Sequence, residues 1–234
     1  MTFRTPALEA VARVARHLGE LGDSMAFLDG AIVDLLLTDP AAPPTRATRD
    51  VDVIVEIASR REYWALQRDL ENRGFVQDEA GGVICRWIVA GIQVDVMPTD
   101  PQILGFTNRW YAPAVRSAQT HPLDDVRVRV VTAPYFVATK LEAFADPERG
   151  GGDLWASHDI QDIIALVDGR SELVADLQAA PADVREYIAQ KLARALAGVE
   201  LQGAVPAHLP PDDASQRRAG MIVERLQRIV APTR

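Results

Sequence analysis

The segment that most constrains this chain is residues 50–55, DVDVIV, in which acidic and β-branched residues alternate. β-Branched residues favour strands, and successive side chains of a strand point to opposite faces of a sheet. Asp50 and Asp52 therefore leave one face together, while the valines between and after them point into a core. The segment predicts a strand that carries two carboxylates on one face.

A second apolar segment, residues 92–97 (IQVDVM), carries Asp95 with the same alternation. If the two strands are neighbours, three carboxylates converge, and their mutual repulsion favours a bound cation. Oxygen ligands suit Mg²⁺ or Mn²⁺, usually with substrate phosphates completing the shell. Two such ions about 3.5–4 Å apart would activate an acceptor hydroxyl and stabilise a leaving group. The alternative for Asp50 and Asp52 is an ordinary solvated strand face.

The remaining pattern predicts an α/β core followed by helices. A tight corner at Ala90-Gly91 joins two strands, and the proline-rich residues 38–48 predict a loop. We expect a domain over residues 1–170 and a helical region over 171–234. Alternation predicts strands over 50–56, 83–89, 92–97 and 126–131. Helical periodicity predicts helices over 6–21, 58–73, 134–145, 158–168, 171–178, 182–197 and 215–230.

Charge and cysteine content restrict the setting. The net charge of −8 argues against broad, non-specific affinity for nucleic acid, although arginines 46, 49, 109 and 116 could line a local path. One cysteine, Cys85, permits no internal disulfide and fits a reducing compartment. No apolar run reaches the roughly 18–20 residues that span a bilayer, and the first residues do not resemble a signal peptide. We therefore expect a cytoplasmic protein with no membrane partner.

Four segments carry a resemblance to a known family. They are TRDVDVIVE at 48–56, QVDVMPTD at 93–100, APYFVATKLEAF at 133–144 and SHDIQDIIALVDGR at 157–170. In this order they resemble the AbiEii-type nucleotidyltransferase toxins, which include the MenT-like proteins and belong to the polymerase-β-like nucleotidyltransferase superfamily. The resemblance covers residues 25–170.

This resemblance implies a mixed-sheet nucleotidyltransferase core with a C-terminal helical region. It implies Mg²⁺- or Mn²⁺-dependent transfer of a nucleoside monophosphate from an NTP to an acceptor hydroxyl, with a tRNA 3′ end as acceptor in some members. It also implies the toxin-like component of a toxin–antitoxin system and a cognate antitoxin as partner. The metal ligands match Asp50, Asp52 and Asp95, and the remaining catalytic residues match Lys140 and Asp159.

The glycine turn of the family matches Asp29-Gly30-Ala31, where relatives usually have Gly-Gly or Gly-Ser. Gly30 permits close approach of a phosphate to the backbone, and Gly30, Ala31, Arg49 and Lys140 are the expected nucleotide contacts. Asp29 brings a negative charge and Ala31 lacks a hydroxyl. The residues that follow, 31–37, predict a helix.

Each further site residue has a structural alternative. Lys140 could be a surface lysine that pairs with Glu142 or Asp146. Ser157 is a good N-cap, and Asp159 and Asp162 in the first turns would then only offset the helix dipole. The run Arg109-Trp110-Tyr111 could stack a base, or it could be core aromatics beside a solvated arginine.

Two other functions share these motifs. Transfer to a small hydroxylated acceptor would keep the fold and the chemistry. A nucleotide- or protein-binding module would follow if Asp29 and Ala31 had disabled the phosphate turn.

Overall fold

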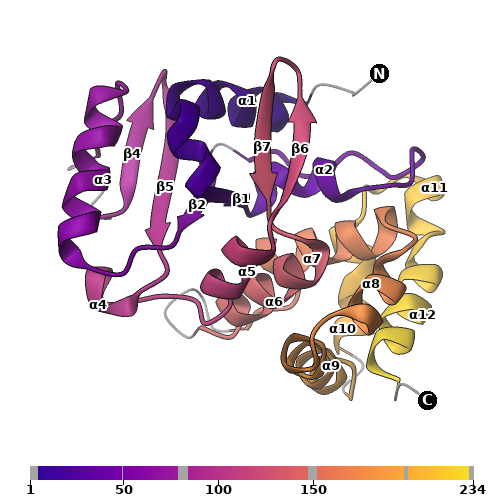
Figure 1. Ribbon diagram of the computed structural model, residues 1–234. Coiled ribbons are helices and arrows are strands. Elements are labelled where there is room, and N and C mark those ends of the chain that lie inside the picture. Colours follow the sequence, from indigo (N-terminus) through magenta and orange to yellow (C-terminus); the bar gives the residue numbers. More distant parts are fainter. Residues whose placement is uncertain (1–4, 49, 79–83, 147–151, 198–199, 232–234) are drawn as a thin grey trace. The chain divides into compact units, whose positions relative to one another are not determined.

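The computed structural model describes residues 5–48, 50–78, 84–146, 152–197 and 200–231 (Figure 1). The chain forms two compact units, Met1–Leu35 with Arg46–Thr132, and Leu36–Thr45 with Ala133–Arg234. This division differs from the predicted boundary after residue 170. The segments over 133–144 and 157–170 lie with the C-terminal helices.

The first unit contains a seven-stranded mixed sheet in the order β3-β4-β5-β2-β1-β7-β6 (Figure 1). β2 pairs in parallel with β5, and β1 pairs in parallel with β7, whereas the other neighbours are antiparallel. The predicted α/β class, with a mixed sheet and C-terminal helices, is confirmed. The strands are β1 (Met25–Leu28), β2 (Asp50–Val55), β3 (Val76–Gln77), β4 (Arg86–Val89), β5 (Ile92–Pro98), β6 (Gln119–Leu123) and β7 (Val126–Val130).

The two faces of the central strands differ as the alternation predicts. The valines that alternate with the carboxylates in β2 and β5 are fully buried, and α1 (Pro6–Leu18) contacts both strands and β7. The opposite face carries the acidic residues. There α5 (Tyr111–Ser117) covers the far end of β5, because the Tyr111 hydroxyl lies 3.2 Å from the sulfur of Met97.

Several elements were missed by the sequence prediction or have other bounds than predicted. The residues after Asp29 form a 3₁₀ turn, η2 (Gly30–Ile32), and then only four residues of helix, α2 (Val33–Leu36), instead of a helix through residue 37. β6 was missed because it is a polar edge strand that contains Pro122, which is tolerated where one side is unpaired. α3 (Arg60–Asn72) begins two residues later than predicted, behind the N-cap Ser59. α4 (Pro101–Leu104) is too short to give a periodic signal.

The second unit is helical. α6 contacts α7, α8 and α9, and α12 contacts α7, α8 and α9, so α6 and α12 hold the bundle together. None of the described helices is long and apolar enough to cross a membrane. The helices are α6 (Ala133–Phe144), α7 (His158–Gly169), α8 (Leu173–Ala179), α9 (Ala182–Ala197), α10 (Glu200–Ala204), α11 (Asp213–Gln216) and α12 (Ala219–Val230).

The proline-rich loop is docked on this helical unit. The backbone N–H groups of Thr38 and Asp39 both donate to the Gly169 carbonyl at 2.9 Å. Arg218 bridges the carboxylates of Asp39 and Asp168 at 2.8 and 2.6 Å. A Cβ at Gly169 would lie 2.8 Å from a Leu37 methyl carbon, so the close approach of the loop requires glycine there.

Cys85 provides a test of the core beside β4. Its side chain is buried, and burial raises the pKa of its thiol to about 12. Because the thiolate is the reactive form, iodoacetamide at pH 8 should label the native protein at least about a hundredfold more slowly than the protein in guanidinium chloride. Mass spectrometry over time measures both rates, and equal rates would show that the strand opens readily.

Candidate functional site

The predicted carboxylates lie on adjacent strands at the centre of the sheet. Asp52 of β2 is the parallel partner of Asp95 of β5, and Asp50 is the partner of Gln93. Parallel partners project to the same face, so all three carboxylates share it. Each of the three residues is half-buried, which leaves the face accessible to a ligand.

Asp95 is held by an arginine from the next strand. Arg86 of β4 is its antiparallel partner, and the guanidinium donates from Nε to Oδ1 and from Nη2 to Oδ2, both at 2.9 Å. This bidentate pair raises the pKa of Arg86 above its ordinary value, so the arginine stays charged. A flipped Gln93 amide would also accept from Arg86.

These contacts determine how the residues fit a metal ion. Both oxygens of Asp95 face Arg86, and one oxygen of Asp50 accepts from the Thr48 hydroxyl at 2.6 Å. Within the described ranges, no group of three or more His, Cys, Asp or Glu side chains is arranged to hold a metal. Mg²⁺ is usually bound through one or two carboxylates and substrate phosphates. Asp50 and Asp52 therefore fit such a site, and Asp95 would need to share its oxygens with Arg86.

The glycine turn starts beside these carboxylates. β1 ends at Leu28, which is the antiparallel partner of Asp52, and the next residues are Asp29 and Gly30. Asp29 has φ 69° and ψ −169°, a backbone conformation that favours glycine. Its carboxylate accepts the Gly30 N–H at 2.7 Å. Ala31 follows inside η2 and is buried.

Lys140 and Asp159 belong to the second unit, where they form a buried ion cluster. The Lys140 ammonium lies 2.6 Å from Asp162 and 3.1 Å from Asp159. Lys140 is 4% exposed and Asp162 is 2% exposed. The alternative of a surface lysine paired with Glu142 or Asp146 is wrong, because α6 turns this side chain toward α7. Ser157 caps α7 as predicted, accepting the Ile160 N–H.

The arginines that could line a local basic path lie in separate parts of the chain, and three of the four are described. Arg49 lies outside the described residues, and Arg46 is half-buried in the loop before β2. The Arg109 guanidinium lies 5.4 Å from the Trp110 ring centroid. Trp110 and Tyr111 are buried, so these aromatics belong to the core. Arg116 pairs with Glu56 on the surface at 3.0 Å.

Arg86 is a site residue that sequence analysis missed, although the hairpin turn at Ala90-Gly91 predicts its position opposite Asp95. The predicted corner at Ala90-Gly91 is the two-residue turn of the β4–β5 hairpin, with Val89 opposite Ile92. Counting back from such a turn places Arg86 opposite Asp95, since the turn length sets the register of a hairpin.

Comparison with solved structures finds chains of similar structure. The structure is similar to the crystal structure of an antigenic nucleotidyltransferase-like protein from Paracoccidioides brasiliensis, with 18% sequence identity, a TM-score of 0.48, and coverage of 86% of this chain and 92% of that chain. No protein-family model matches the chain, and no curated protein matches it. At this identity residue roles do not carry over, and the resemblance to AbiEii-type toxins stays a prediction.

The buried lysine generates a test of stability. Lys140→Met would leave the Asp159 and Asp162 carboxylates buried without their cation, so we expect a loss of about 3–5 kcal/mol in the free energy of unfolding. Urea denaturation measures it. Lys191→Met, at the chain's other lysine, is the control and should change stability by less than about 0.5 kcal/mol.

A second variant separates charge from packing in this cluster. Adding Asp159→Asn and Asp162→Asn to Lys140→Met removes the uncompensated charges and should recover part of the lost stability. A Lys140→Met loss below about 1 kcal/mol would show that water reaches the cluster.

Proposed function

We propose that the first unit is a metal-dependent nucleotidyltransferase that moves a nucleoside monophosphate from an NTP to an acceptor hydroxyl. The observation that carries the proposal is the register of β1, β2 and β5. It puts Asp52 between Asp95 on one side and the start of the Asp29-Gly30 turn on the other. A carboxylate pair beside a glycine turn is the arrangement that this reaction needs for its cation and its triphosphate.

In this proposal Asp50 and Asp52 hold Mg²⁺ or Mn²⁺ together with phosphate oxygens of the NTP. When bound, the cation would lower the pKa of the acceptor hydroxyl and offset charge on the leaving pyrophosphate. The acceptor oxygen forms a bond to the α-phosphorus as the α–β phosphoanhydride bond breaks. Asp95 is the third carboxylate, as metal ligand or as acceptor of the hydroxyl proton.

Arg86 positions Asp95 in this scheme. Its bidentate contact fixes the plane of the carboxylate on the face shared with Asp52. The guanidinium also offsets one of the three negative charges, which lowers the repulsion among the three carboxylates. Arg86 is therefore a positioning residue whose charge competes with a cation at Asp95.

We propose an RNA 3′ end, tRNA in particular, as the acceptor, and a toxin-like role with a cognate antitoxin. Both come from the four sequence segments rather than from the geometry. Transfer to a small hydroxylated acceptor uses the same residues, and only the acceptor in the assay distinguishes the two. Lys140, Asp159 and Arg49 stay predicted contributors by resemblance.

A nucleotide- or protein-binding module without transfer is the second candidate. It is favoured by the Asp29 carboxylate, which occupies the Gly30 N–H that a phosphate would otherwise use. The Arg86–Asp95 ion pair favours it as well, because it engages both oxygens of the third carboxylate.

Asp52→Asn tests the transferase. Purified protein is incubated with each α-labelled NTP, Mg²⁺ or Mn²⁺, and either total tRNA or small alcohols. We expect label on the acceptor with the wild type and at least about a hundredfold less with Asp52→Asn, because a neutral amide is a poor ligand for a hard cation. Asp69→Asn, an exposed carboxylate on α3 of the same unit, is the control and should keep full activity.

Label transferred equally by Asp52→Asn would refute the site. Absence of label with the wild type, together with an NTP-induced rise in melting temperature, would select the binding module. Label on small alcohols and none on tRNA would select the small-molecule acceptor.

Asp29→Gly tests the turn. Glycine adopts the observed φ without strain, and its introduction releases the Gly30 N–H and removes a negative charge from the expected phosphate position. We expect NTP affinity to rise by roughly tenfold, measured by calorimetry with Mg²⁺ present. Asp124→Gly is the matched control, because Asp124 also has positive φ, 55°, and it lies between β6 and β7. Weaker NTP binding by Asp29→Gly would mean that the carboxylate itself supports the nucleotide.

A further inference from the structure

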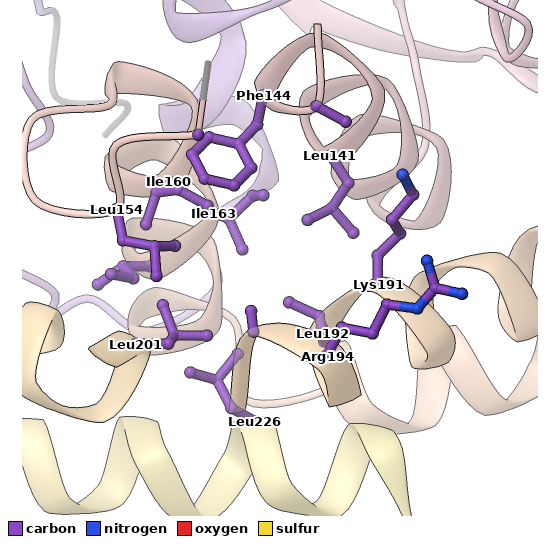
Figure 2. Close-up of a pocket in the computed structure, with 14 residues that line it drawn as sticks. Leu141, Phe144, Leu154, Ile160, Ile163, Lys191, Leu192, Arg194, Leu201 and Leu226 are labelled. Atoms are coloured by element: carbon purple, nitrogen blue, oxygen red, sulfur yellow. The ribbon is translucent and has the colours of Figure 1, made fainter. Parts of the chain in front are cut away.

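The helical unit contains a cavity of about 450 Å³ that belongs to no part of the carboxylate site (Figure 2). Its walls come from α6, α7, α9, α10 and α12 and from the residues before α7. Figure 2 shows Leu141, Phe144 and Ile163 facing Leu192 and Leu226 across the open space. Cavities of roughly 300–1,000 Å³ between helices are typical small-molecule sites.

The side chains that line the cavity are almost all apolar. Apart from Lys191 and Arg194, every lining residue in the described part of the chain is apolar or glycine, and none of them carries a carboxylate or amide side chain. Such walls offer nothing to a nucleotide base, a sugar or another polar ligand, whose buried polar groups would lack partners. They suit an aliphatic chain, which gains by leaving water and by filling space that has few opposing atoms.

The two cations lie together at one side of the cavity. Lys191 and Arg194 both belong to α9 and are spaced i, i+3, so they lie on one helical face. Figure 2 shows both side chains on the same side of the cavity. Lys191 is half-buried and Arg194 is exposed. The Lys191 ammonium lies 5.5 Å from the centroid of the Tyr187 ring. Among the residues that the structure describes, neither cation has a carboxylate within salt-bridge distance, so neither charge is offset by an ion pair there.

We propose that this cavity binds a long-chain carboxylate of the fatty-acid type. The aliphatic chain occupies the space lined by the leucines, isoleucines and Phe144, and the carboxylate lies between Lys191 and Arg194. The two cations favour an anionic head, and the apolar described lining favours a hydrocarbon tail. Every lining residue lies in the second unit, so the site shares no residue with the carboxylates Asp50, Asp52 and Asp95 of the first unit.

Calorimetry with the full chain tests the proposal. Octanoate, decanoate, dodecanoate and tetradecanoate are titrated below their critical micelle concentrations, with dodecanol as the neutral analogue. We expect one saturable site, affinity that rises several-fold for each two added carbons until the cavity is full, and about fivefold to tenfold weaker binding of dodecanol than of dodecanoate.

Variants locate the ligand. Ala195→Phe fills the cavity, and Ala145→Trp narrows it at an exposed position whose substitution does not disturb the core. Each should weaken dodecanoate binding by at least about tenfold with the melting temperature retained. In the double variant Lys191→Gln/Arg194→Gln, the affinity for dodecanoate should be no higher than the affinity of the same variant for dodecanol. Arg228→Gln, an exposed arginine of α12 outside the lining, is the matched control and should bind as the wild type does.

Three results would contradict the proposal or one of its parts. No saturable binding of any chain length would overturn the proposal and leave a protein segment as the occupant of the cavity. Binding unaffected by both Ala195→Phe and Ala145→Trp would place the ligand elsewhere. Equal affinity for dodecanoate and dodecanol in the wild type would overturn the role of the two cations.

Discussion

The parallel pairing of β2 with β5 is the interaction on which the rest of the first unit depends. Its register buries Val51 and Val53 beside Val94 and Val96 on one face and sets Asp52 beside Asp95 on the other. A slip of one residue would turn charges into the core and valines toward water, so burial of the valines fixes the place of the carboxylates. The candidate site is thus a consequence of core packing rather than an addition to it.

Three carboxylates on one face repel one another, and neighbouring side chains and backbone groups lower this repulsion through hydrogen bonds and an ion pair. Arg86 engages both oxygens of Asp95, Thr48 donates to Asp50, and the turn residue Asp29 uses the adjacent Gly30 N–H. In the proposed reaction, each of these contacts occupies an atom that the cation or the phosphates would use. Binding of a cation and an NTP would therefore exchange these contacts, which would link nucleotide affinity to the turn and to Arg86.

The two lysines of the chain both lie in the second unit, and they differ in whether carboxylates offset their charge. Lys140 is buried and is held by Asp159 and Asp162, whereas Lys191 stands at the rim of an apolar cavity. One ammonium is surrounded by carboxylates and the other has none in reach among the described residues. Removing a buried charge leaves its partners uncompensated and destabilises the fold, whereas a charge at a cavity rim with no carboxylate in reach is suited to an anionic ligand.

The strands that carry Asp50, Asp52 and Asp95, the burial of their valines, and the helices from α6 to α9 could be predicted from the sequence, because these features depend on local periodicity and propensity. The hairpin that sets Arg86 opposite Asp95 could also be read from its turn. The burial of Lys140, the docking of the proline-rich loop at Gly169, and the cavity lined by five helices became visible only in the folded chain. Those features depend on contacts between residues distant in the chain, and no local pattern encodes which helix faces meet.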